Sequence, residues 1–313
     1  MKTVAQGMLW RDIALAGAQV IDGDTLRVRD PDPGAWGALQ GRLRLRGDGT
    51  LVLRLAGVDA AESHYPGGPP GLQAQPAAAA ALATRQLTAC LAAAPEARLT
   101  VCGLGADRYG RALVLAWTQA RTVLAAAAVE AELADSLNAG LLAGGACFPD
   151  LWDQMPASWS AQLATIAGQA RREGRGLWAL DGGQQWFALD DWPALCGQRL
   201  ILPRLFRRIA EFWRLQAAGD RGRGGAGSSS GSSGGGGGRG ASGGGASGAA
   251  TGTALDDCLR EFLEQRECQV RLAGGGPERP FADWVELDQG ACRFTGQVEN
   301  FLYQSCSSGK KLT

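Results

Sequence analysis

Five segments between residues 15 and 118 alternate apolar and polar side chains with a period of two, and this pattern constrains the fold more than any other feature. Such alternation is typical of β-strands that bury one face. Gly23 and Gly110 interrupt the pattern where turns are expected. The segments are AQVIDGDTLRVRD (18–30), GRLRLRG (41–47), TLVLRLAGVD (50–59), ARLTVCGLG (97–105) and GRALVLAW (110–117).

Three stretches rich in alanine and leucine predict helices that pack on these strands. The first, within 71–94, is expected to begin after Pro76, and the others span 124–143 and 157–172. A run of strands, one helix, further strands and then helices is typical of the α+β class. We therefore expect a small antiparallel barrel with helices packed against it.

Residues 219–253 consist largely of glycine and serine, and they account for much of the excess in the 47 glycines of the 313-residue chain. Such a segment cannot bury enough apolar area to offset its ordering entropy, which predicts a flexible linker or insertion. An Arg-Gly tail that binds nucleic acid is the alternative reading. The predicted divisions are an N-terminal extension (1–14), the barrel domain (15–183), the linker (219–253), and the two parts of a C-terminal module on either side of it (184–218 and 254–313).

The segments on either side of the linker predict a small α+β C-terminal module. Residues 203–216 and 255–266 each place apolar side chains on one helical face, and strands are expected after residue 267. The first helix also carries Arg204, Arg207, Arg208 and Arg214. A basic face of this kind can bind membranes or phosphates, but we expect a solvated polar face. The module is also a candidate site for protein partners.

Composition excludes several classes of function. Lys plus Arg and Asp plus Glu both number 31, which argues against a broadly basic, histone-like nucleic-acid binder. The single histidine, His64, excludes any site that needs two imidazoles. Eight cysteines include no CxxC pair, so a zinc ribbon is not expected. No apolar run could span a membrane, and Arg11 and Asp12 interrupt any signal sequence, so we expect a soluble protein of the cytoplasm or an organelle.

Three short segments combine carboxylates with arginines. They are Asp22-Gly23-Asp24-Thr25, the stretch from Arg54 to Glu62 (RLAGVDAAE), and Asp107-Arg108-Tyr109-Gly110-Arg111. Carboxylate oxygens suit Ca²⁺ or Mg²⁺, and guanidinium groups match phosphate oxygens. Acid, metal and arginine together are the groups that hydrolysis of a phosphodiester requires. Each segment alone could be an ordinary turn or a surface strand, but the three in this order are far more specific.

In this order the segments resemble the staphylococcal nuclease (thermonuclease) family, from about residue 15 to the Gly174-Arg175-Gly176-Leu177-Trp178 stretch near 180. The resemblance implies an α+β fold with a five-stranded OB-fold barrel. It also implies a calcium-dependent endonuclease that cleaves DNA or RNA and leaves a 3′-phosphate. The implied calcium ligands are Asp24, Asp59 and the carbonyl of Ala60, with Asp22 beside them. Glu62 is implied as the general base, Arg54 and Arg111 as clamps on the scissile phosphate, and Arg108 and Tyr109 as contacts to an adjacent phosphate.

Two departures from the family pattern stand out. Ala61 replaces the proline that usually precedes the glutamate, which removes rigidity and no functional atom. Residues 31–50 form a long hairpin that could add strand area or reshape the groove. His64 is expected to be a loop residue, with substrate contact as the alternative. A non-catalytic scaffold that binds nucleic acid or protein on the same barrel is the second hypothesis, because fold does not determine function.

Overall fold

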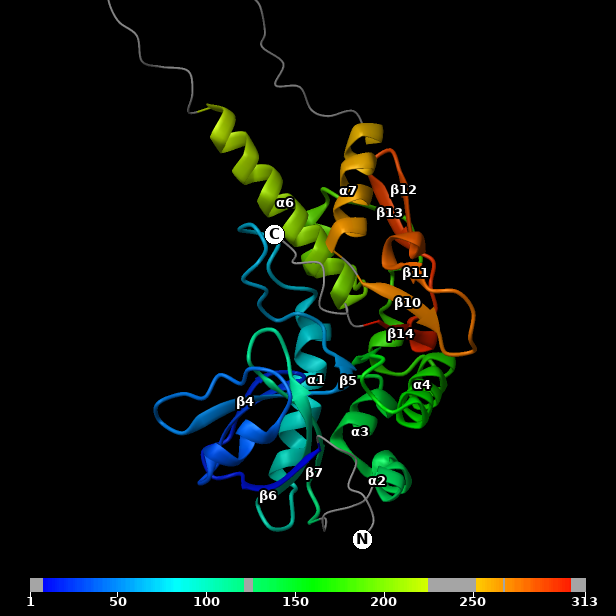
Figure 1. The fold of residues 1–313 in the computed structure, drawn as a ribbon. Helices are drawn as coiled ribbons and strands as arrows, with labels where there is room; N and C mark the ends of the chain where they lie inside the picture. The colour runs from blue at the N-terminus through cyan, green and yellow to red at the C-terminus, as the bar shows by residue number, and fades with distance from the viewer. Residues whose placement is uncertain (1–7, 121–125, 225–251, 267, 305–313) are drawn as a thin grey trace, which may run out of the picture.

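The structure is a computed structural model that describes residues 8–120, 126–224, 252–266 and 268–304 (Figure 1). Most of the predicted linker lies outside these ranges. The described chain is α+β, as expected from the sequence. No helix within these ranges is long and apolar enough to cross a membrane.

A six-stranded sheet with the order β1-β6-β7-β4-β3-β2 forms the N-terminal half. Its neighbouring strands run antiparallel, except that β4 and β7 are parallel. In β4 every second residue is buried, which places Leu51, Leu53 and Leu55 in the core. The strands are β1 (Leu9–Ala14), β2 (Gln19–Asp22), β3 (Thr25–Arg29), β4 (Thr50–Leu55), β6 (Arg98–Ala106) and β7 (Ala112–Trp117).

The closed five-stranded barrel is not confirmed, because β1 and β2 remain unpaired ends of the sheet in the part of the chain that the structure describes. The sheet still curves. The Arg11 guanidinium of β1 reaches the Asp30 carboxylate just after β3, at 2.7 Å, and register shifts interrupt the β2–β3 and β6–β7 pairs. The ion pair thus ties the edge strand β1 to the end of β3, and these two strands are not neighbours in the sheet.

Two strand predictions were wrong. Residues 41–47 belong to no strand, and most of them are exposed. The alternation of arginine and leucine in these residues is equally compatible with a surface segment and with a strand. Conversely, residues 1–14 were expected to be an extension outside the sheet, yet β1 pairs along its whole length with β6.

The helix predictions for this half were largely confirmed. Helix α1 (Ala77–Ala92) begins directly after Pro76, and α4 (Ala157–Arg172) matches its predicted range. The predicted helix at 124–143 is broken into α2 (Ala126–Glu132), a 3₁₀ turn and α3 (Leu137–Ala143). Ser136 causes the break, since its hydroxyl accepts a hydrogen bond from the Ala139 amide at 3.1 Å and caps α3.

The C-terminal half contains three helices and two small sheets, with strand orders β11-β10-β14 and β12-β13-β9, within the described ranges. Its elements are β9 (Phe187–Ala188), α5 (Trp192–Gly197), α6 (Pro203–Gly224), α7 (Gly252–Arg266), β10 (Gln269–Leu272), β11 (Arg279–Pro280), β12 (Val285–Asp288), β13 (Ala291–Phe294) and β14 (Phe301–Tyr303). A further pair, β5 (Gly57–Asp59) with β8 (Phe148–Asp150), lies between the halves. Figure 1 shows α6 running past the loop that follows β5.

Two hydrophobic cores hold these elements together. The first lies between the six-stranded sheet and helices α1, α3 and α4. The second joins the apolar face of α6, including Phe206 and Ile209, to Ala61, Leu72 and Ala79 of the N-terminal half. Because this second core includes Ala61, it holds α6 against the segment that carries Asp59 and Glu62.

Candidate active site

The turn between β2 and β3 positions the first two carboxylates. Gly23 has no room for a side chain, since a Cβ there would lie 2.3 Å from the Cβ of Ala83 in α1 and 2.8 Å from that of Ala60. Asp24 is 3% exposed, and its carboxylate accepts hydrogen bonds from the Thr25 hydroxyl and the Ala60 amide, both at 2.8 Å. Close packing on α1 therefore directs Asp24 toward the segment that follows β5.

Arg54 of β4 joins Asp24 to Asp59 at the end of β5. Its guanidinium forms an ion pair with Asp24 and donates to the Asp59 carboxylate at 2.9 Å and to the Val58 carbonyl at 3.1 Å. Gly57, with φ of 77°, allows the tight turn between the two strands. Asp59 is 2% exposed. Asp24 and Asp59, which are 35 residues apart in the sequence, thus both form ion pairs with the Arg54 guanidinium.

Gln75 holds Glu62 in place. The backbone N–H of Glu62 donates to the side-chain oxygen of Gln75 at 3.0 Å, and the backbone N–H of Gln75 donates to the Glu62 carbonyl at 2.9 Å. The side-chain nitrogen of Gln75 donates to the Ile201 carbonyl at 2.7 Å. Ala61 is fully buried. These contacts constrain the loop in which Ala61 replaces the family's usual proline.

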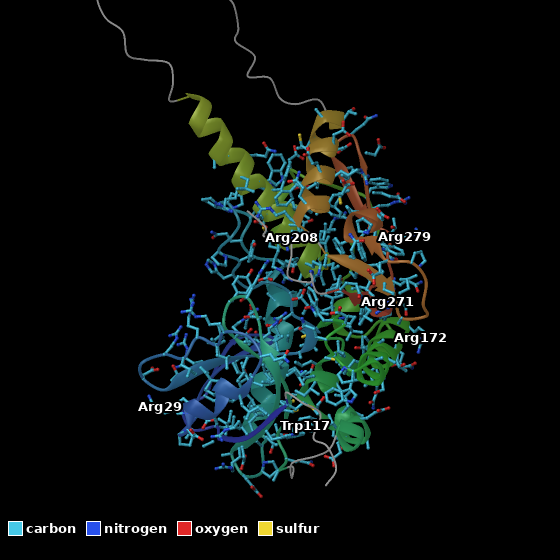
Figure 2. The ribbon with its side chains drawn as sticks, in the orientation of Figure 1. Arg29, Trp117, Arg172, Arg208, Arg271 and Arg279 are labelled. Carbon is cyan, nitrogen blue, oxygen red and sulfur yellow. The ribbon has the colours of Figure 1, made fainter. Side chains whose placement is uncertain are left out.

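A second guanidinium, from α6, completes the cluster, and the sequence motifs did not assign it to the site. Arg207 donates to both oxygens of Asp59, at 2.9 and 3.0 Å, and to Glu62 at 2.5 Å. Figure 2 labels its neighbour Arg208 on the part of α6 that faces the centre of the molecule. The prediction that the arginines of this helix form a solvated face is wrong for Arg207 and for Arg204, which is 7% exposed and pairs with Asp150. The four arginines among residues 203–216 were the available signal.

The ion pairs control the charge of the buried groups. Burial disfavours the charged form of Arg54, but the charges of Asp24 and Asp59 outweigh burial and raise its pKa. Burial alone would raise the pKa of Asp59, but Arg207 and Arg54 lower it to about 2. Asp59 is therefore a carboxylate at any physiological pH.

Glu62 and Asp22 differ from Asp59 in this respect. Burial raises the pKa of Glu62, and Arg207 offsets that effect only in part. Burial and the neighbouring charge of Asp24 also raise the pKa of Asp22, whose carboxylate accepts from the Gly23 amide and the Ser63 hydroxyl. A glutamate with a raised pKa inside a charged cleft is a candidate proton acceptor.

The donor set fits a calcium ion. Asp22, Asp24, Asp59 and Glu62 supply hard oxygen atoms, and when ionised they exceed the two guanidinium groups by two negative charges. The Ala60 amide donates to Asp24, so the Ala60 peptide is adjacent to that carboxylate. Within the described ranges, no three His, Cys, Asp or Glu side chains are arranged as a ready metal cage. Calcium would thus take Asp24 and Asp59 from the guanidinium groups that hold them here.

The Asp107–Arg111 turn lies apart from this cluster. Asp107 accepts from the Tyr109 and Arg111 amides at 2.9 Å and from the Arg111 guanidinium at 2.7 Å. The guanidinium carbons of Arg108 and Arg111 lie 4.8 and 5.4 Å from the centre of the Tyr109 ring. The contacts described for Arg111 thus join it to its own turn and not to Asp24, Asp59 or Glu62.

The turn and the cluster are nevertheless neighbours. Arg111 immediately precedes β7, whose first residue, Ala112, pairs with Leu53 beside Arg54. Burial raises the pKa of Tyr65, and Glu211 and Tyr109 raise it further, so Tyr65 is near both the turn and α6. His64 is exposed in the same loop.

Comparisons with known proteins add no assignment. A scan against models of protein families found no match, and a search of curated proteins found none either.

Proposed function

We propose that this chain is a calcium-dependent nuclease that hydrolyses phosphodiester bonds within DNA or RNA and leaves a 3′-phosphate. The observation that carries the proposal is the convergence of Asp24, Arg54, Asp59 and Glu62. Asp24 lies on a different segment from Arg54, Asp59 and Glu62, yet together with Arg207 these side chains form one largely buried, ion-paired cluster. The motif order of the staphylococcal nuclease family and the curved sheet support the same reading, including an OB-type fold for this half.

Each side chain has a role that its surroundings suit. Glu62 accepts the proton of the attacking water. Arg54 binds oxygens of the scissile phosphate, with Arg111 turning from Asp107 toward the same group. Asp24, Asp59 and the Ala60 carbonyl hold the calcium ion, which supplies positive charge to the phosphate and lowers the pKa of water. Asp22 stays beside the ligands and adds to the negative potential that attracts the cation.

Arg207 belongs to this site as well. Its guanidinium occupies Asp59 and Glu62 when neither cation nor phosphate is present. If Asp59 held a cation, the Arg207 guanidinium would be available to pair with a phosphate oxygen of an anionic substrate. The C-terminal half thus contributes directly to the chemistry.

A non-catalytic scaffold is the second candidate, and one observation favours it. Arg207 pairs with both Asp59 and Glu62, so a permanent ion-pair network could serve stability alone. In that case the chain would bind nucleic acid or protein on the sheet without cleaving it.

Cleavage of plasmid DNA and of RNA, with calcium or with a chelator, separates the two candidates. We expect cleavage in calcium only, with 3′-phosphate ends, and a loss of about 10²–10⁴ in rate for Glu62→Gln. Glu211→Gln is the matched control, since Glu62 and Glu211 are both 13% exposed and both pair with arginines of α6. Equal rates for the two variants would reject Glu62 as the base, and no cleavage by the wild type would favour the scaffold.

A further inference from the structure

A second polar feature lies beside the cluster, between the segment 41–45 and the turn 106–110. The two segments enclose a groove of about 690 Å³. The family resemblance placed Arg108 and Tyr109 near an adjacent phosphate, but it gave no role to residues 41–45. These residues belong to the long hairpin that departs from the family pattern.

Backbone contacts hold the groove in shape. The Arg44 amide donates to the Gly110 carbonyl at 2.9 Å, and the Ala106 amide donates to the Gln40 carbonyl at 2.8 Å. Gly110 has φ of 81°, and a Cβ at this position would lie 2.9 Å from the Arg44 nitrogen. Only glycine therefore lets the two segments approach so closely.

The groove is basic although the chain is neutral. Arg42, Arg44 and Arg108 line it, whereas its one acidic residue, Asp107, is already bonded to Arg111. Arg42 and Arg44 are two positions apart in the sequence, and both are exposed and line the groove. Such a row of guanidinium groups suits a ligand with repeated negative charges.

Tyr109 adds an aromatic surface to these charges. It is 54% exposed, and the Arg108 guanidinium lies over its ring and donates to its hydroxyl at 2.7 Å. An exposed aromatic ring beside guanidinium groups is a surface on which a base can stack. An acidic peptide would use the arginines but would gain nothing from this ring.

We propose that this groove binds the sugar-phosphate backbone of a single nucleic-acid strand, with Arg42 and Arg44 on consecutive phosphates and Tyr109 under a base. The groove lies next to the carboxylate cluster, because Arg111 ends the turn that lines the groove and directly precedes β7, which pairs with β4 beside Arg54. The proposal rests on the proposed function for its class of ligand but not for cleavage. A strand bound here extends beyond the phosphate that is cut.

Binding of a fluorescein-labelled 12-nucleotide single strand to the full chain tests the proposal, with a chelator present to prevent cleavage. We expect Arg42→Ser with Arg44→Ser to weaken binding about 10-fold or more at low salt. The slope of log K against log salt should fall by about 1.4, since each lost phosphate contact on a single strand removes about 0.7. Tyr109→Leu should weaken binding without changing the slope.

Arg172→Ser with Arg279→Ser is the matched control, because it removes the same charge from exposed positions (Figure 2). Figure 2 labels both residues on the side of the molecule opposite β4. An equal loss in both double variants, or no loss in either, would overturn the proposal. So would displacement of the strand by polyglutamate as readily as by unlabelled oligonucleotide. Failure of the nuclease proposal would instead show as no cleavage by the wild type in calcium while groove-dependent binding persists.

Discussion

The buried carboxylate cluster and the basic groove are neighbours that are built in opposite ways. In the cluster, Asp24 and Asp59 are nearly inaccessible, and guanidinium groups from β4 and α6 neutralise part of their charge. In the groove, Arg42 and Arg44 are exposed, and backbone hydrogen bonds hold the walls. Strong, weakly screened interactions therefore dominate the first region, and salt-sensitive interactions dominate the second.

This contrast shows why a net charge of zero says little about nucleic-acid binding in this chain. Acidic groups are concentrated where a cation is needed, and basic groups are concentrated beside them. It also predicts that changes in the cluster alter chemistry and stability together, whereas changes in the groove alter affinity alone. The following variants test that separation, from the largest expected effect to the smallest.

Arg54→Lys should have the largest effect. Lysine keeps the charge but cannot bridge Asp24 and Asp59 or bind a phosphate through two parallel hydrogen bonds. We expect kcat to fall by about 10²–10³, as for loss of one donor to a developing negative charge. Arg98→Lys, which alters an exposed pair with Asp12, is the control and should leave kcat unchanged. Comparable rates for the wild type and Arg54→Lys would remove Arg54 from the chemistry.

Arg207→Met tests whether the same residue serves stability and cation loading. Removing one partner of a largely buried pair should cost about 3 kcal/mol of unfolding free energy in a chelator. Calcium should recover more of that stability in the variant than in the wild type, because Asp59 then pairs with Arg54 alone and not with two guanidinium groups. Urea unfolding with and without calcium measures both effects.

Arg171→Met is its matched control, since Arg171 pairs with Glu299 outside the cluster and is 22% exposed, against 24% for Arg207. It should lose stability with no difference between calcium and chelator. A calcium response of equal size in both variants would show that Arg207 does not compete with the cation.

The ion pair between Arg11 and Asp30 lies outside both regions, and the pH dependence of its contribution to stability serves as a reference. Burial alone would raise the pKa of Asp30, but hydrogen bonds from Arg11, the Asp32 amide and Trp36 outweigh burial and lower it. A lowered folded-state pKa contributes stability above the ordinary value of about 3.9, and this stability is lost as pH falls through the folded-state pKa. Asp30→Asn should therefore cost about 2 kcal/mol at pH 7 in urea unfolding, and this cost should decrease as the pH falls below the ordinary aspartate pKa. A cost independent of pH would contradict this account.

Gly110→Ala should have the smallest effect on stability and still disturb the groove. Alanine at positive φ costs about 1 kcal/mol, and its Cβ would also press on Arg44. Gly49→Ala is the control, because Gly49 has φ of 76° and a Cβ added there would meet nothing within 4 Å. Single-strand binding should weaken several-fold only in Gly110→Ala. Equal affinity in both variants would show that the close approach of the two segments is irrelevant to binding.

The sequence predicted the local parts of the candidate site better than its long-range parts. The turn that carries Asp24, the strand that carries Arg54 and the segment up to Glu62 are short patterns whose neighbours in sequence are neighbours in space. Arg207 is 145 residues from Glu62, and nothing in the helical pattern distinguishes an arginine in a salt bridge from a solvated one. Residues 41–47 show the same limit, because their alternation is compatible with a strand and with an exposed surface segment. Closure of the sheet depends on which strands pair at its ends, β1 and β2, and alternation within a strand does not encode its partner.

Calorimetric titration of the full chain with calcium tests most directly whether the cluster is a metal-dependent catalytic centre. We expect saturable calcium binding at one site in the wild type, loss of that binding in Asp24→Asn, and tighter calcium binding in Arg207→Met. Asp12→Asn, which removes an exposed carboxylate on β1, should leave calcium binding as it is in the wild type. Absence of heat at millimolar calcium in the wild type, or binding that survives Asp24→Asn unchanged, would contradict the account.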